Sequence, residues 1–332
     1  MQSLNKIEEK VLAGREISAK EAGYLSSLQA PSVMDLFCAA NRIRRYFRGN
    51  AVDLCAIVNA KSGKCPEDCT YCAQSSRSTA PISSYALLDE SAVTEKAKEA
   101  KRGGAKRFCI VTSGKRVSGR ELEKIALMIA SVKSLGLLPC ATLGLLNKED
   151  LLLLKTAGLE RYHNNLESSE RFFPRICTTH SYEDKLQTIR NAGAAGLSVC
   201  SGGIFGLGET WQDRIDMAFA LREIGPDSVP INFLTPIRGT ELGRSKPLAP
   251  LEALKIISIY RFILPEREIR ICGGRLQILG EFNAFIFFAG ADGLLIGNYL
   301  TTLGRGYQED LDLIRNFGLS ALSGIDTGKD LS

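Results

Sequence analysis

The sequence predicts an α/β protein whose main body is a (β/α)8 TIM-type barrel with an N-terminal helical cap. Short apolar segments typical of strands alternate with longer amphipathic segments typical of helices, almost to the end of the chain. Eight such pairs fit within roughly 250 residues, the usual size of this barrel. Glycines follow many helical segments, as expected for helix ends that lead into a strand. An open doubly wound sheet is the alternative.

The first 48 residues are expected to form the cap. Apolar residues at helical spacing, among them Met34, Phe37, Ile43 and Phe47, lie beside an arginine-rich face. The barrel is expected over residues 49–319 and a C-terminal tail over 320–332. We find no interdomain linker, low-complexity tract or repeat.

After the cap, strand and helix candidates follow in turn. The strand candidates are residues 52–59, 107–112, 137–143, 161–166, 196–201, 228–233, 268–272 and 293–296. Helical segments fill the intervals, for example residues 121–133, 183–191, 211–224 and 251–263.

Composition narrows the class of protein. The 332 residues are 45% hydrophobic and 24% charged, which is ordinary for a globular chain that buries a core. The net charge of +5 is spread along the chain, so we expect no nucleic acid partner. The charged start lacks a secretory signal, and Asn283 and Asp292 interrupt the most apolar late segment, so we expect a cytoplasmic protein without a membrane helix. In that compartment ten cysteines indicate metal ligands, catalytic groups or core residues, not disulfides.

Three cysteines lie close together directly after the first strand candidate. Cys65, Cys69 and Cys72 have the spacing Cys-x3-Cys-x2-Cys. Such a loop can hold one face of an iron-sulfur cubane and leave one iron open, whereas a ferredoxin cubane and a structural zinc site each take four ligands. No further Cys or His lies near in the sequence. The alternatives are a zinc knuckle completed by a distant residue, or plain loop cysteines.

This spacing resembles the signature of the radical S-adenosylmethionine superfamily. The resemblance implies a 4Fe-4S cluster whose open iron takes the amino and carboxylate groups of S-adenosylmethionine, and an electron that releases a 5'-deoxyadenosyl radical. The run Gly202-Gly203-Ile204-Phe205-Gly206-Leu207-Gly208-Glu209 resembles the segment near the adenine in these enzymes. By the same resemblance Gly203, Ile204, Gly206 and Tyr71 contact this cofactor.

Four further cysteines, Cys109, Cys140, Cys200 and Cys272, lie within strand candidates. Barrel strands turn alternate side chains inward, so cysteines on several strands can converge in the lumen and hold a second cluster. For each one taken alone, the alternative is a buried core cysteine.

The surroundings of these cysteines resemble the biotin synthase family over residues 34–319. The matching segments are KSGKCPEDCTYCAQSSR, RFCIVTSG, CATLG, YHNNLESS, VCSGGIFGLGETWQDR, SVPINFL, IRICGGR and Thr301-Thr302. The resemblance implies radical insertion of sulfur between two saturated carbons of dethiobiotin. It also implies a flavodoxin or ferredoxin as electron donor, and a homodimer.

By this resemblance, Cys109, Cys140, Cys200 and Arg270 hold an auxiliary cluster that donates the sulfur. The family pattern is a 2Fe-2S cluster, but here Cys272 follows Arg270 by two residues and faces the same side of the strand. We hypothesise that Cys272 is a fourth thiolate ligand of a four-iron cluster, in place of Arg270. Cys55 could also point inward, although a core cysteine is favoured there, and Cys38 and Cys177 are expected to be structural.

The remaining site residues are also implied by the resemblance. Asn165 would contact substrate and cofactor, and Glu167 would bind the ribose hydroxyls in place of an Asp. Lys185 replaces an arginine that contacts the cofactor carboxylate, with loss of the bidentate fork. Asn232 would contact the ureido ring of dethiobiotin, and Thr301 with Thr302 its carboxylate; the alternatives are a strand end and a capped turn.

Two questions stay open at this level. His163 could relay a proton or could be a hydrogen-bonded structural residue. The rival functions are another radical enzyme of the same branch, namely a hydrogenase cofactor maturase or a methylornithine synthase, and a non-catalytic iron-sulfur carrier.

Overall fold

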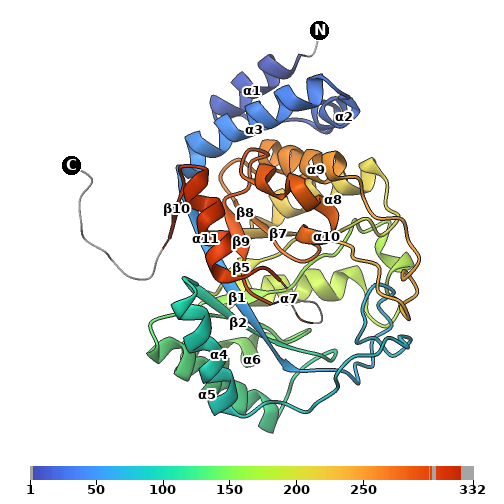
Figure 1. Ribbon diagram of the computed structural model, residues 1–332. Helices are drawn as coiled ribbons and strands as arrows, with labels where there is room; N and C mark the ends of the chain where they lie inside the picture. The colour runs from blue at the N-terminus through green and yellow to red at the C-terminus, as the bar shows by residue number, and fades with distance from the viewer. Residues whose placement is uncertain (1–2, 299, 301–303, 323–332) are drawn as a thin grey trace, which may run out of the picture.

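A closed barrel of parallel strands forms the centre of the computed structural model, which describes residues 3–298, 300 and 304–322 (Figure 1). Its strands are β1 (Ala51–Lys61), β2 (Arg107–Thr112), β3 (Leu138–Thr142), β4 (Arg161–His163), β5 (Ser198–Cys200), β7 (Ser228–Phe233), β8 (Glu268–Ile271) and β9 (Gly293–Leu295). They pair in that order, and β9 pairs back onto β1 with Gly293 beside Asp53. The barrel prediction is therefore confirmed, and the open sheet is excluded.

Two short strands add to the barrel. β6 (Gly203–Phe205) pairs with β7 and β10 (Ser320–Ala321) pairs with the start of β1. The first lies within the glycine-rich run, where only a turn was expected. The second lies at the first residues of the expected tail.

Helices surround the barrel at the predicted places. They are α4 (Glu90–Arg102), α5 (Arg120–Ser134), α6 (Lys148–Thr156), α7 (Tyr182–Ala194), α8 (Trp211–Ile224), α9 (Pro250–Ile263), α10 (Arg275–Leu279) and α11 (Tyr307–Asn316), with 3-10 turns at Phe173–Arg175 and Gly280–Ile286. Capping boxes begin two of them, Ser181 with Asp184 at α7 and Thr210 with Asp213 at α8.

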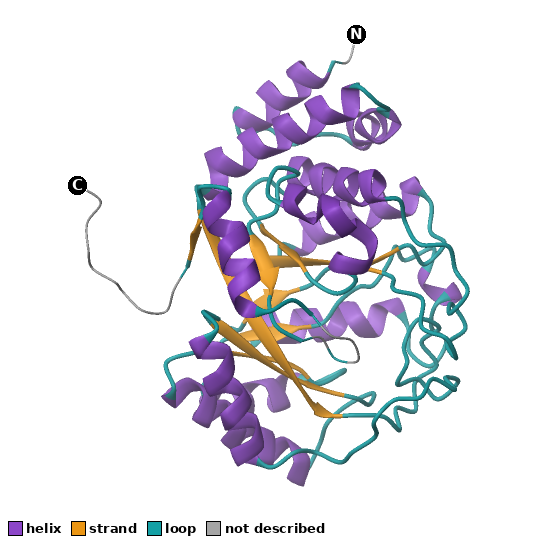
Figure 2. Ribbon diagram, in the orientation of Figure 1, coloured by secondary structure: helices purple, strands orange, loops and turns teal. Residues whose placement is uncertain are grey.

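The N-terminal cap consists of α1 (Leu4–Leu12), α2 (Ala19–Ser27) and α3 (Ser32–Arg48). Helices α2 and α3 pack against α8 and α9, at the end of the barrel where β1 begins (Figure 1). At the opposite end, Figure 2 shows long loops in teal. Those loops follow the carboxyl ends of the strands, where enzymes with this barrel place their active sites.

The two faces of the barrel wall differ in chemistry. Residues that point outward, such as Phe108, Ile110, Ala141 and Ile231, are buried and apolar. Thiols and charged groups occupy the alternate, inward positions. Within the described residues, no helix combines the length and the apolar character that a membrane span requires.

Candidate active site

The three-cysteine loop lies at the carboxyl end of the barrel, between β1 and α4. It is held by the segment that precedes α7. The Thr70 amide donates to the Ile176 carbonyl at 3.0 Å, and the Asp68 carboxylate accepts from the amides of Thr178 at 2.9 Å and Thr179 at 3.2 Å. The Asp68 carboxylate therefore joins two loops that lie more than a hundred positions apart in the chain.

One cavity of about 460 Å³ joins this loop to the barrel lumen. Its lining includes the loop thiols and the lumen thiols, namely Cys65, Cys69, Cys72, Cys55, Cys109, Cys140, Cys200 and Cys272. It also includes most of the other predicted site residues, namely Tyr71, Asn165, Glu167, Lys185, Ile204, Asn232 and Arg270. Residues assigned to two separate cysteine groups thus share one chamber.

Four of the lumen thiols form one contact cluster. Cys55, Cys109, Cys140 and Cys272 pack together with Val111 and Leu295. Cys109 on β2 lies directly beside Cys140 on β3, because these two residues are partners in the register of the two strands. Cys55, for which a plain core role was favoured, faces the lumen with the others.

Cys200 completes the lumen set from β5. Its Sγ lies 3.2 Å from Nδ1 of His163, which is its register partner on β4. Burial lowers the pKa of His163 to about 4, with Lys185, Arg270 and Arg161 acting in the same direction. The ring is therefore neutral at physiological pH, a state that favours a hydrogen-bonded role beside the thiol.

A buried layer of charges lies beneath the thiols. Arg107 contacts Asp53 at 3.2 Å and Arg161 contacts Glu268 at 3.5 Å, while Arg270 contacts both carboxylates. Three guanidinium groups face two carboxylates, so the layer carries one excess positive charge. An excess positive charge in a low-dielectric lumen favours an anionic ligand such as a thiolate-bound cluster.

Burial and these arginines shift the pKa values of the lumen thiols in opposite directions. Burial raises the pKa of Cys200 to about 11 and that of Cys272 to about 12, although Arg270 acts in the opposite direction on both. A hydrogen bond from Cys55 lowers the pKa of Cys140 to about 7, and Arg161 and Arg107 add to that effect. Cys140 is thus the lumen thiol closest to ionisation at neutral pH.

Both terminal nitrogens of Arg270 are engaged by the protein. Its Nη1 donates to the carbonyls of Asp53 at 3.2 Å and Leu294 at 2.9 Å, and its Nη2 contacts the carboxylates of Asp53 and Glu268. Burial alone would lower the pKa of Arg270, but the two carboxylates outweigh it and raise the pKa well above its ordinary value. The guanidinium is stabilised in its charged form, which has no lone pair to give a metal.

The expected cofactor side of the chamber is built on β4, β6 and the turn between β4 and η1. The Asn165 side chain accepts from the Gly202 amide at 3.1 Å and donates to Glu167 at 3.3 Å. Asn232 donates to the Gly203 carbonyl at 3.2 Å and accepts from the Gly273 amide at 3.0 Å. Ile204 lines the cavity, whereas the predicted cofactor residues Gly203 and Gly206 are not part of its lining. Thr301 and Thr302 lie outside the described residues.

The chamber suits a polar ligand. Among the described residues, Thr112 Oγ1 and Asn164 Oδ1 are buried without a hydrogen-bond partner, and both residues line the cavity. A buried polar atom left unpaired is costly, and a bound molecule can satisfy it. The eight thiols supply the soft donors that iron-sulfur clusters require. The residues therefore fit the two groups that the sequence pattern implies.

Two residues were missed by the sequence reasoning. Cys177 was expected to be structural, but its Sγ lies 3.8 Å from that of Cys69 and 3.2 Å from Nδ1 of His180. No further Cys or His lies near the cysteine loop along the chain, but the fold brings Cys177 and His180 beside it. The spacing Cys-x2-His at 177–180 was the available signal.

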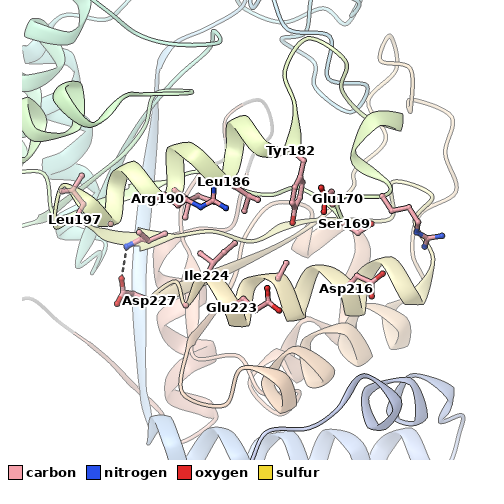
Figure 3. Close-up of a pocket in the computed structure, with 16 residues that line it drawn as sticks. Ser169, Glu170, Tyr182, Leu186, Arg190, Leu197, Asp216, Glu223, Ile224 and Asp227 are labelled. Atoms are coloured by element: carbon pink, nitrogen blue, oxygen red, sulfur yellow. Dashed lines mark hydrogen bonds between the residues drawn. The ribbon is translucent and has the colours of Figure 1, made fainter.

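A second cavity, of about 850 Å³, lies on the outside of the barrel between α7 and α8 (Figure 3). Tyr182, Leu186 and Arg190 face it from α7, and Asp216 and Glu223 from α8. Its described lining contains no thiol and none of the predicted site residues. The chamber in the lumen is therefore the candidate active site.

Comparison with known proteins gives the family. The model of the Radical SAM superfamily matches residues 60–221, and that of the Biotin and Thiamin Synthesis associated domain matches residues 230–320. A biotin synthase of Thermodesulfovibrio yellowstonii is 54% identical over 287 residues, which are 86% of this chain and 90% of that protein. The chain belongs to the biotin synthase family. Another biotin synthase, from Geobacter metallireducens, is 46% identical over 96% of this chain and 97% of its own.

Membership of the biotin synthase family identifies a radical S-adenosylmethionine enzyme that inserts sulfur, and it implies a 4Fe-4S cluster with S-adenosylmethionine. A solved methylornithine synthase has the same fold, with a TM-score of 0.84 at 21% identity over 96% of this chain and 98% of that one. The FeFe-hydrogenase maturase HydG from Carboxydothermus hydrogenoformans has a TM-score of 0.80 at 17% identity over 96% and 78%. These likenesses show the fold alone, so the rival functions are not favoured.

Proposed function

We propose that this chain converts dethiobiotin to biotin by radical insertion of one sulfur atom. The observation that carries the proposal is the single chamber that joins the three loop thiols to the lumen thiols. The two carbons that receive sulfur carry no acidic proton, so a positioned base cannot activate them. When bound, a cubane with S-adenosylmethionine supplies a hydrogen-abstracting radical, and an auxiliary cluster supplies sulfur.

The proposed role of each residue follows from its place in the chamber. Cys65, Cys69 and Cys72 would hold the cubane at the mouth of the barrel. Glu167 would accept hydrogen bonds from the ribose, while Tyr71, Lys185 and the wall formed by Gly203, Ile204 and Gly206 would enclose the rest of S-adenosylmethionine. Asn165 and Asn232 would orient dethiobiotin, with its carboxylate expected at Thr301 and Thr302.

We further propose that Cys109, Cys140, Cys200 and Cys272 hold the auxiliary cluster and that it contains four irons. Two observations support Cys272 over Arg270. Cys272 packs in the thiol cluster, and the two terminal nitrogens of Arg270 are occupied by Asp53, Glu268 and Leu294. Cys55, in the same cluster, is the alternative fourth thiolate.

Anaerobic turnover with dethiobiotin, S-adenosylmethionine and a low-potential reductant tests the function. The chain should form both 5'-deoxyadenosine and biotin. Cys72→Ala should form neither, whereas Cys140→Ala should form 5'-deoxyadenosine without biotin, because it keeps the loop thiols. If the unaltered chain formed 5'-deoxyadenosine and no biotin, a rival function would be favoured.

Iron and sulfide counts test the auxiliary cluster. The Cys65→Ala/Cys69→Ala/Cys72→Ala variant should retain about four irons per chain after reconstitution. Adding Cys272→Ala should lower that count, and adding Cys55→Ala should not. About two irons in the triple variant would contradict the four-iron cluster.

Two further features are proposed on the family resemblance, namely a flavodoxin or ferredoxin as electron donor and a homodimer. A cytoplasmic location and the division into a cap, a barrel and a tail at residues 48 and 319 are proposed on the composition and the strand and helix pattern of the sequence. A reducing compartment suits ten cysteines without a disulfide among the described residues.

A further inference from the structure

A second group of metal-type donors lies behind the cysteine loop. Cys69 Sγ, Cys177 Sγ and a ring nitrogen of His180 all lie within 4.8 Å of one another. Cys177 is buried, and the His180 side chain is only 7% exposed. None of the roles proposed above uses Cys177 or His180.

The distances agree with one tetrahedral ion. Two thiolates at about 2.3 Å from the same zinc ion lie about 3.8 Å apart. The separation of Cys69 Sγ from Cys177 Sγ is 3.8 Å, and Nδ1 of His180 lies 3.2 Å from Cys177 Sγ. The thiolates of a cubane bind different irons and must lie farther apart, so this pair is spaced for a mononuclear site.

The surrounding residues hold these donors in place. Asp68 fixes the backbone of Thr178 and Thr179, which lie between Cys177 and His180. A carboxylate oxygen of Glu67 contacts Nδ1 of His180 and accepts from Thr179 Oγ1 at 2.8 Å. Glu67 is buried beside the His180 ring, and its carboxylate can supply an oxygen donor for the fourth position when the ion replaces the proton of that contact.

We propose that, in protein without the cubane, Cys69, Cys177 and His180 form a mononuclear site for Zn²⁺, with Glu67 at the fourth position. The site goes beyond the proposed function and needs only these residues. Because Cys69 would belong to both sites, zinc and the cubane exclude each other. The competition rests on the proposed function, in which Cys69 is a ligand of the cubane. The zinc site itself does not rest on it. Zinc bound here would therefore block cluster assembly.

Metal counting on the full chain tests the site directly. Protein freed of metal under anaerobic conditions is titrated with Co²⁺ and then with Zn²⁺, and sulfur-to-cobalt charge transfer and bound zinc are measured. Cys177→Ser and His180→Ala should each lose one zinc equivalent, or bind it at least about tenfold more weakly. The matched control Cys65→Ser/Cys72→Ser should retain that equivalent, because it removes only cubane ligands.

The barrel thiols are unchanged in all of these variants and should bind the same amount of zinc in each. A difference in bound zinc between variants therefore comes from the site beside the cysteine loop. Equal zinc binding by the unaltered chain, Cys177→Ser and His180→Ala would overturn the proposal. Loss of the same equivalent in Cys65→Ser/Cys72→Ser would also overturn it, since the ion would then belong to the three-cysteine loop. Thermal unfolding of the metal-free variants checks that each is folded.

A second readout concerns assembly. Zinc added before iron and sulfide should slow the appearance of cubane absorbance in the unaltered chain and not in Cys177→Ser. Equal slowing in both would contradict the competition. The metal counts use no iron, sulfide or turnover, so failure of the zinc site is distinguishable from failure of the proposed function.

Discussion

Glu167 combines an unusual backbone with a buried carboxylate. Its φ of 70° lies in the left-handed region, which costs a residue other than glycine about 1–3 kcal/mol. Burial raises the pKa of Glu167, although Lys185 and hydrogen bonds from Asn165 and Tyr71 act in the opposite direction. Strain and burial at one position favour a ligand-binding role, here the ribose hydroxyls of S-adenosylmethionine.

Glu167→Gln tests this role at the scale of one residue. The amide keeps the shape and loses the charge, so each hydrogen bond from the ribose weakens and the Kd for S-adenosylmethionine should rise about tenfold. Anaerobic equilibrium dialysis measures it. Glu160→Gln, at a pair exposed on the surface, should leave the Kd unchanged. An unchanged Kd in Glu167→Gln would remove the residue from the cofactor site.

At the scale of elements, the glycine-rich run depends on close approach between β6 and β7. A Cβ at Gly202 would lie 2.0 Å from the Pro230 carbonyl oxygen. The backbone fixes the position of the Cβ and of the carbonyl oxygen, so no change of rotamer relieves this contact. Only glycine fits at position 202, because there is no room for a Cβ.

Gly202→Ala should therefore destabilise the protein by about 1–3 kcal/mol or more, because the two strands must separate. Urea unfolding of the cluster-free chain measures the change. Gly193→Ala is the matched control, since nothing lies within 4 Å of its Cβ and its backbone is helical. That control should be neutral or stabilise by up to about 1 kcal/mol.

Asp213, in the capping box of α8, should make the stability of the protein depend on pH. Burial alone would raise the pKa of Asp213, but hydrogen bonds from Thr210 and Ser169, with Arg171, lower it to about 2 from 3.8. A carboxyl group whose folded pKa is lowered stabilises the protein above its unfolded pKa. That contribution is lost as the pH falls from 3.8 towards 2.

Asp213→Asn should cost about 2 kcal/mol at pH 7, and the difference from the unaltered chain should shrink as the pH falls from 3.8 towards 2. Urea titrations of cluster-free protein at several pH values measure it. A difference that stayed constant with pH would show that the carboxylate charge contributes nothing and that Asn caps the helix in another way.

At the scale of the whole molecule, Asp292 joins three parts of the fold. Its carboxylate accepts from Arg261 of α9 at 2.5 Å, from Arg48 of the cap at 2.6 Å and from the Ile269 amide of β8 at 2.8 Å. The Asp292 side chain is 1% exposed. The cap and the closing strands therefore share one buried charge.

Asp292→Ala should lower the free energy of unfolding by about 3–5 kcal/mol, because the buried Arg261 guanidinium loses its carboxylate partner and keeps only backbone carbonyls as acceptors. Denaturant unfolding measures the loss. Glu95→Ala, which removes an exposed pair with Lys98, should leave the free energy of unfolding unchanged. A small effect of Asp292→Ala would mean that the backbone carbonyls around Arg261 are enough to hold its charge.

Local sequence patterns were enough to predict the barrel strands and the three-cysteine loop. Apolar periodicity predicted the eight barrel strands, because inward and outward residues alternate along each strand. The spacing of Cys65, Cys69 and Cys72 indicated an open iron, because chelation within one loop depends only on nearby residues.

Tertiary structure alone decided which distant groups meet. Closure of β9 onto β1 brings Cys55 among the lumen thiols. It also sets Arg270 against Asp53, 217 positions away in the chain. Folding of the segment before α7 onto the cysteine loop sets Cys177 beside Cys69, 108 positions away. Such contacts follow from barrel closure and loop packing, which involve the whole chain, so no local spacing encodes them.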